Sequence, residues 1–94
     1  MTVVDKIVSR AANKVQNATG YGLEEIRSRT KVIPVLQARI LLVRLLRDKD
    51  MTLQQIGVAI NRRHPAVCHL LEVYRNEYDT DPLFRKLANT VELF

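Results

Sequence analysis

The sequence predicts an all-α fold, a compact bundle of about six helices that contains a helix-turn-helix. Apolar residues recur at the three- and four-residue spacing of one helix face, and Leu, Ile, Val and Ala supply most of the apolar bulk. The sequence has neither the alternating pattern of a half-buried strand nor an Asn-Gly hairpin turn or internal repeat. Because 94 residues fall within the size of one domain, we expect residues 1–94 to form a single domain.

Residues 3–15 predict the first helix. Thr2 and Asp5 form a plausible capping box at its amino-terminal end. The helix is expected to end near Asn17, because Gly20 follows and glycine adopts the left-handed angles that close a helix. The face expected to be buried consists of Val3, Val4, Ile7, Val8, Ala11, Ala12 and Val15.

The middle of the chain predicts a short helical piece, a basic loop and a long helix. The short piece covers Leu23–Arg27, and residues 28–31 form the loop. Residues 33–48 are apolar with few gaps, which indicates a central, mostly buried helix. The one polar edge of this helix is positively charged, and it is either a solvated face or a set of phosphate contacts. The edge consists of Arg39, Arg44 and Arg47.

Two further helices are predicted around a short polar break, residues 61–63. Thr52 caps the first of them, with Gln55 three residues on, and a new helix begins near His64 and Pro65, since proline is tolerated in a first turn. The first helix is expected to supply apolar contacts through Leu53, Ile56, Val58 and Ile60. The second is expected to bury Val67, Leu70, Leu71, Tyr74 and Tyr78, with His64, Cys68 and Glu72 on the opposite face.

The last helix is predicted to begin where Asp81 precedes Pro82, which is a strong start signal. Apolar residues continue from there at helical spacing, and we expect this helix to complete the bundle. The residues concerned are Leu83, Leu87, Val91 and Phe94.

Charge is unevenly distributed along the chain, whose net charge is +5. Residues 1–26 are neutral, and residues 27–69 carry nine basic against two acidic side chains, a net charge of +7. Residues 70–94 carry three basic against five acidic side chains, a net charge of −2. Segregation of this kind indicates a surface that binds a polyanion.

Several classes of protein are disfavoured. A single cysteine, Cys68, cannot form an internal disulfide, so a reducing, cytoplasmic location is expected. Residues 1–12 lack the continuous apolar run of a signal peptide, and no segment is expected to enter a membrane. His64, Cys68 and His69 lie close on one helix, but no fourth ligand is nearby, so no metal site is expected. No nucleophile and base have a recognisable spacing, and neither enzymatic activity nor a cofactor is expected.

Residues 56–70 read I-G-V-A-I-N-R-R-H-P-A-V-C-H-L. This stretch resembles the signature I-G-x-x-F-G-G-R-D-H-S/T-T-V-x-H-A of the carboxy-terminal DNA-binding domain of the bacterial replication initiator DnaA, after one residue of the glycine pair is skipped. Upstream, residues 21–23 are similar to the family's Y-G-V, residues 28–31 to its S-R-K-R loop, and residues 36–39 to the x-x-A-R that opens its long helix. The similarity covers roughly residues 4–78, with the elements in the same order.

The resemblance implies a helix-turn-helix of the TrpR-like superfamily that binds duplex DNA. The second helix of the pair would enter the major groove, and the basic loop would reach the minor groove. The residues it would place toward bases are Leu53, Gln54, Arg62, Arg63, His64, Pro65 and Ala66. The residues it would place in the minor groove or at phosphates are Arg29, Lys31, Arg39, Arg44, Arg47 and His69.

The sequence departs from the family at positions that would read bases. Arg63 replaces an acid, and arginine donates to guanine where aspartate accepts from cytosine. Pro65 and Ala66 replace hydroxyl residues, although the Ala66 methyl still fits against a thymine methyl. We therefore expect an altered sequence preference.

The chain has no G-x-x-x-x-G-K-[ST] motif, so the ATPase module that accompanies this domain in full-length initiators is not expected. Because the chain begins at Met1, a free-standing protein is one expectation. It would act in replication initiation or its regulation, with replication proteins as partners, or in transcription as a regulator of a phage or mobile element. A second class of hypothesis is a helical protein-interaction module that binds an acidic partner. RNA binding ranks last, because no exposed aromatic platform is evident.

Overall fold

The computed structural model describes residues 2–92, which form six helices and contain no strand, so the all-α prediction is confirmed. One hydrophobic core joins the helices, with fully buried side chains such as Val15, Leu42, Ile56 and Phe84 contributed by different helices. The helices are α1 (Val3–Thr19), α2 (Leu23–Arg27), α3 (Ile33–Asp48), α4 (Leu53–Ile60), α5 (His64–Thr80) and α6 (Pro82–Glu92).

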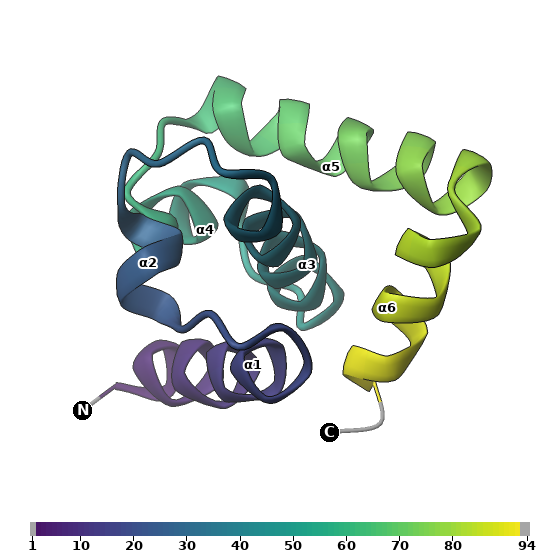
Figure 1. Ribbon diagram of the computed structural model, residues 1–94. Coiled ribbons are helices and arrows are strands. Elements are labelled where there is room, and N and C mark those ends of the chain that lie inside the picture. Colours follow the sequence, from purple (N-terminus) through teal and green to yellow (C-terminus); the bar gives the residue numbers. More distant parts are fainter. Residues whose placement is uncertain (1, 93–94) are drawn as a thin grey trace.

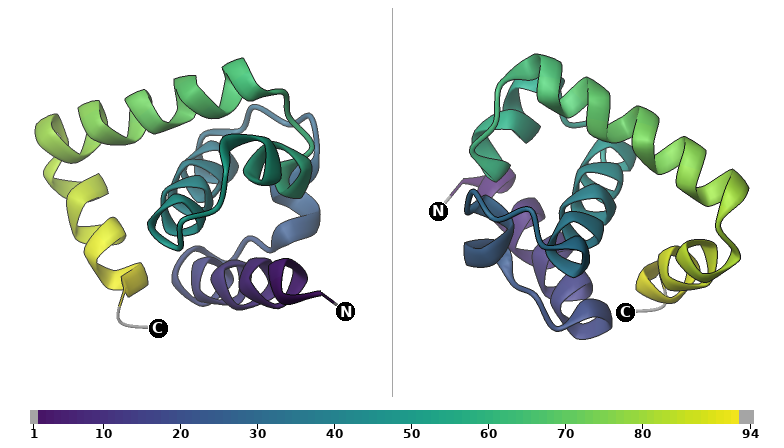
Figure 2. Two further views of the ribbon diagram at one scale, coloured as in Figure 1. Left: turned by 180° about the vertical axis from the view of Figure 1, so that it is seen from behind. Right: turned by 45° about the horizontal axis from the view of Figure 1, so that its top comes forward.

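Helix α3 lies in the middle of the molecule and is mostly buried, as its run of apolar residues predicts, although Ile33 at its start is exposed. It contacts α1, α2, α4 and α5. Figure 1 shows α1 along one side of α3 and α5 along the other, with α2 and α4 together at one end of α5 and α6 at the other. The two views of Figure 2 show the same arrangement, in which α5 spans the molecule and α6 turns back toward α1. The core therefore packs against the buried sides of α4 and of the start of α5.

The first helix begins and ends through local hydrogen bonds. The Thr2 hydroxyl accepts from the Asp5 N–H at 3.1 Å, and the Asp5 carboxylate accepts from the Thr2 N–H at 3.2 Å, so the predicted capping box is present. Gly20 adopts a φ of 86°, and its N–H donates to the Gln16 carbonyl at 2.8 Å. The helix therefore continues to Thr19, two residues past the predicted end, because closure waits for the glycine.

The turn between α4 and α5 is tight. Thr52 and Gln55 form the predicted capping box at the start of α4, and Asn61 ends the helix in the left-handed region with a φ of 60°. The Arg62 N–H then donates to the Gly57 carbonyl at 2.8 Å. This closure brings the Arg62 carbonyl so close that a Cβ at Gly57 would lie 2.5 Å from its oxygen, which is why glycine is needed there.

Three apolar residues that were expected in the core are exposed instead. Val3, Val58 and Leu83 keep 74%, 72% and 80% of their surface accessible. Val58 follows Ile56 by two residues, which on a helix places the two side chains about 200° apart, so burial of Ile56 turns Val58 outward. Val3 and Leu83 lie in the first turns of their helices, where fewer neighbours are within reach. The prediction for Phe94 lies outside the described residues.

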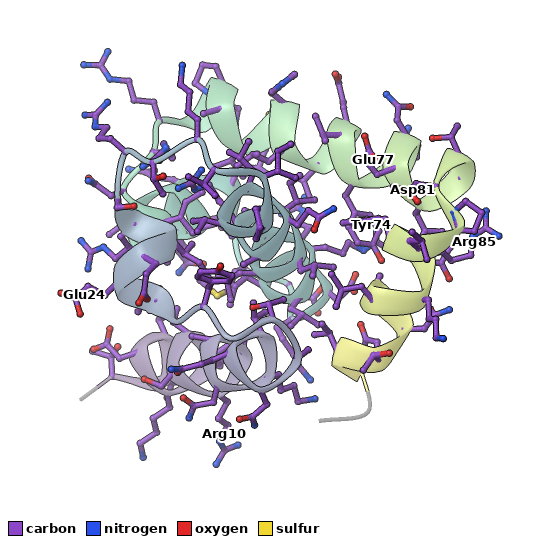
Figure 3. All side chains as sticks on the ribbon, in the orientation of Figure 1. Arg10, Glu24, Tyr74, Glu77, Asp81 and Arg85 are labelled. Atoms are coloured by element: carbon purple, nitrogen blue, oxygen red, sulfur yellow. The ribbon has the colours of Figure 1, made fainter. Side chains whose placement is uncertain are left out.

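The corner between α5 and α6 is held by side chains of both helices. The Asp81 carboxylate accepts from the Leu83 and Phe84 N–H groups at 3.0 and 3.3 Å, which caps α6. Arg85 donates to the Tyr78 and Asp79 carbonyls at the end of α5, at 2.8 and 3.0 Å. Tyr74 packs edge-on against Phe84, and Figure 3 shows it between α5 and α6. The corner therefore keeps the acidic end of α5 against α6.

We expect Gly57→Ala to destabilise the domain by about 2 kcal/mol, because the overlap with the Arg62 carbonyl outweighs the better helix propensity of alanine. Asn61→Gly is the matched control at the same turn, since glycine adopts the observed φ without steric cost, and its stability should be unchanged or slightly higher. Urea denaturation of the three proteins measures both effects. A Gly57→Ala protein as stable as wild type would show that the turn tolerates a Cβ.

We expect the free energy of unfolding to fall as the pH rises above about 10. Burial raises the pKa of the Tyr74 phenol, although the nearby charge of Arg44 opposes this shift. The phenol therefore ionises first in the unfolded chain, and the stability that Tyr74 contributes is lost as the pH rises through its folded pKa. Chemical denaturation as a function of pH should show a smaller decline for Tyr74→Phe than for wild type, and equal declines would contradict this reasoning.

Candidate nucleic-acid interface

A hollow of about 560 Å³ lies between the α2–α3 loop (residues 28–32) and the turn that joins α4 to α5. We call it the basic hollow, because four arginines and a histidine line it and no carboxylate does. Its lining consists of Arg27, Arg29, Gln54, Gly57, Val58, Asn61, Arg62, Arg63 and His64. It therefore joins two segments that the sequence analysis identified separately, the basic loop and the helix-turn-helix.

Arg39 holds the loop from the core side. Its position on the polar edge of α3 predicts an exposed side chain at phosphates, and the structure contradicts that expectation, because Arg39 keeps only 3% of its surface accessible. Its guanidinium donates to the carbonyls of Ile26 at 2.9 Å, Ser28 at 3.0 Å and Thr30 at 3.4 Å. Burial, and then the charge of Arg62, lower the pKa of Arg39, yet arginine remains protonated in proteins. Arg39 is thus a structural cation that satisfies loop carbonyls.

Arg62 holds the same loop from the other side. The resemblance placed it toward bases, but its guanidinium turns back, with Nη2 donating to the Ser28 carbonyl at 2.6 Å. Nη1 lies 3.5 Å from the Arg27 carbonyl, 3.3 Å from that of Ile60 and 3.0 Å from that of Asn61. These bonds engage both terminal nitrogens of the guanidinium, so in this arrangement they compete with the pair of hydrogen bonds that Arg62 would donate to a guanine.

The start of α5 is the most exposed basic part of the turn. Arg63 occupies the N-cap position without a side-chain capping bond, and Arg63, His64 and Pro65 are all exposed. No hydrogen bond or ion pair to residues 2–92 engages the Arg63 side chain. The positive end of the helix dipole adds to this charge. The helix start therefore presents cationic donors to solvent.

The basic loop presents a second set of cations. Arg29 and Lys31 are both exposed, and only Arg29 reaches the basic hollow. Backbone N–H groups of the loop donate to its own hydroxyls, Thr30 to Ser28 at 3.4 Å and Val32 to Thr30 at 3.3 Å. The loop is therefore tied locally, while its carbonyls face Arg39 and Arg62.

The other two arginines of α3 lie elsewhere. Arg44 pairs with Asp48 at 3.1 Å and stacks over Tyr74 at 5.2 Å, in a second hollow that Asp79 and Glu92 also line. This hollow holds three carboxylates against two arginines, Arg44 and Arg75, so it is less favourable for a phosphate than the basic hollow. Arg47 is exposed, and its Nη1 donates to the Met51 carbonyl at 2.8 Å. The structure thus gives each of these arginines an intramolecular partner.

The remaining predicted residues divide between the surface and the core. Gln54 lines the basic hollow, and His69, which follows His64 by five residues on α5, is exposed. Leu53 is half-buried and packs against the core, and Ala66 is half-buried. Cys68 lies 3.9 Å from the His64 ring through its Sγ atom. Gln54 therefore joins the interface, whereas Leu53 contributes mainly to packing.

Four residues of the basic hollow were not identified from the sequence as part of a site, and one of them, Val58, was expected in the core. Arg27 belongs to the basic block, but it ends a helix and was not assigned a role. Asn61 lines the hollow because its left-handed backbone turns the chain, and Gly57 does so because it lacks a side chain. The glycine followed by a polar break was the available signal for the last two.

Within residues 2–92, no group of three metal-binding side chains occurs, and no helix is long and apolar enough to cross a membrane. The sequence matches no protein-family model and no curated protein. The geometry of the basic hollow is thus the basis for any functional conclusion.

We expect Arg39→Met to destabilise the domain by about 3 kcal/mol, because the loop carbonyls lose a buried charged donor. Arg44→Met is the matched control: it removes the same charge from the same helix but breaks an exposed ion pair with Asp48 and a cation–π contact with Tyr74, together worth about 1 kcal/mol. The midpoints of urea unfolding provide the comparison. Equal losses in the two variants would show that the hydrogen bonds of Arg39 do not hold the structure together.

Proposed function

We propose that this chain binds duplex DNA with a sequence preference, with the start of α5 in the major groove and the α2–α3 loop at the adjacent minor groove. The observation that carries this proposal is the basic hollow, where two cationic segments far apart in sequence lie side by side without a carboxylate. A major groove about 12 Å wide admits one α-helix. A basic loop beside that helix suits the neighbouring minor groove, which attracts arginine and lysine.

The distribution of charge along α5 supports this orientation. Arg63 and His64 stand at the start of the helix, and from its middle onward Glu72, Glu77 and Asp79 outnumber the single basic residue, Arg75. Only the amino-terminal turns of α5 are therefore compatible with phosphate, and the acidic end belongs away from the duplex. Figure 1 shows that α5 is long enough to separate its two ends across the molecule.

A preference for particular bases is the role we assign to Arg63. It is exposed, makes no side-chain hydrogen bond to residues 2–92 and lies at the helix start, where side chains of a helix-turn-helix meet base edges. Arginine donates two hydrogen bonds to O6 and N7 of guanine. We therefore propose a guanine under Arg63, while Arg29 contributes affinity at the minor groove.

The resemblance to the DNA-binding domain of the initiator DnaA supports the same docking mode. On that basis the proposal extends to a role in replication initiation or its regulation, in the cytoplasm. Regulation of transcription in a phage or mobile element would use the same interface, so it belongs to the same proposal. The absence of an acid at position 63 favours a recognition sequence different from the initiator's.

Selection from random duplexes, followed by affinity measurements, tests the proposal. We expect an enriched motif, and we expect Arg63→Ala to weaken binding to it roughly tenfold while relaxing preference at one base pair. Arg10→Ala is the matched control, because it removes the same charge from α1, at the opposite edge from the α4–α5 turn, where Figure 3 shows Arg10 projecting away. Its affinity should stay within about twofold of wild type at physiological salt.

Two results would contradict the proposal. The first is that no motif is enriched and that the two variants weaken binding equally, which would reduce the interaction to net charge. The second is that poly-glutamate competes as well as duplex DNA of equal charge, which would favour the rival hypothesis of an acidic protein partner.

A further inference from the structure

Arg62 links the two segments that we propose contact DNA. It belongs to the turn before α5, yet its Nη2 donates at 2.6 Å to the carbonyl of Ser28, 34 residues earlier in the chain. Its Nη1 lies 3.5 Å from the carbonyl of Arg27, which ends α2. A single side chain therefore spans the space between the helix-turn-helix and the basic loop.

The base of this link is itself fixed. Nη1 of Arg62 also donates to the carbonyls of Ile60 and Asn61, at 3.3 and 3.0 Å, so the guanidinium is held against its own turn. The hydrogen bond from the Arg62 N–H to the Gly57 carbonyl closes this turn. Movement of the guanidinium relative to α5 is thus restricted.

The loop is fixed from the core as well. Arg39 donates to the same Ser28 oxygen at 3.0 Å, and to the carbonyls of Ile26 and Thr30 on either side. Two guanidinium groups converge on one carbonyl, an arrangement that like charges make costly. Its effect is to turn the carbonyls of the loop inward and to leave Arg29, between Ser28 and Thr30, exposed at the basic hollow.

We propose that Arg62 is a positioning residue for DNA binding, which keeps Arg29 in register with Arg63 so that the loop and α5 engage one duplex as a rigid unit. This inference rests on the proposed function. A loop whose backbone is ordered in advance loses less conformational entropy when DNA binds, and the contact of Arg29 therefore contributes more to the affinity. The neighbouring Arg63 is the base-reading residue, and Arg62 acts through the loop.

A double-mutant cycle on the selected duplex tests this role. The variant Arg62→Lys keeps the charge, but a single ammonium lacks the planar fork that serves several carbonyls at once. We expect Arg29→Ala to weaken binding about tenfold in the wild-type background but less than about threefold in the Arg62→Lys background. In the Arg63→Lys background, the matched control, Arg29→Ala should keep its full effect. Equal effects in all three backgrounds would overturn the proposal.

Amide hydrogen exchange without DNA gives a second readout, independent of whether the domain binds a duplex. The N–H groups of Thr30 and Val32 should exchange several-fold faster in Arg62→Lys than in wild type, and at the wild-type rate in Arg63→Lys. Unchanged exchange in Arg62→Lys would overturn the positioning role even if DNA binding holds. If the loop loosens but wild type selects no duplex, Arg62 holds the loop and it is the proposed function that fails, together with the role of Arg62 in DNA binding.

Discussion

The carbonyl oxygen of Ser28 accepts hydrogen bonds from both Arg39 and Arg62, and the arrangement of the basic surface depends on this shared acceptor. Arg39 reaches it from α3, which the core holds on several sides, and Arg62 reaches it from the turn before α5. Arg39 thereby connects the core to the loop, and Arg62 connects the loop to the helix-turn-helix. Without the hydrogen bonds at the Ser28 carbonyl, the loop would be held less firmly. The side of the basic hollow that Arg29 lines would then not be fixed relative to the helix-turn-helix.

The two positively charged guanidinium groups at this carbonyl repel each other, so the arrangement is unusual if it serves stability alone. Charged groups are stabilised in an interior only when their hydrogen bonds are made. Here the carbonyls of six residues lie within 3.5 Å of a nitrogen of Arg39 or Arg62, namely Ile26, Arg27, Ser28, Thr30, Ile60 and Asn61. The repulsion that remains is reduced when an anion lies nearby. A phosphate backbone at the basic hollow would supply such an anion, so the same arrangement that orders the loop also favours a polyanionic ligand.

The fold was largely predictable from the sequence, whereas the roles of individual arginines were not. Capping residues such as Thr2, Thr52 and Asp81, together with apolar spacing, place the helices within a few residues of their observed ends. Helical periodicity cannot tell an exposed arginine from a buried one, because it does not include the carbonyls of a distant loop. Arg39 was therefore misplaced at the surface, and Arg62 was assigned to bases although its shortest hydrogen bond goes to Ser28, 34 residues away. Arg63 has no such partner within residues 2–92 and is exposed at the start of α5, and its role at bases stays a prediction.

The central claim is that this domain binds a DNA duplex through one face, which is centred on the basic hollow. Backbone amide chemical shifts during titration with the selected duplex test it residue by residue. The account predicts large changes at Arg29, Gly57 and His64, and none beyond small drifts along α1 and α6. Changes concentrated at the second hollow, which Arg44, Tyr74 and Glu92 line between α3, α5 and α6, would contradict this claim, and so would changes spread evenly over all basic residues including Arg10.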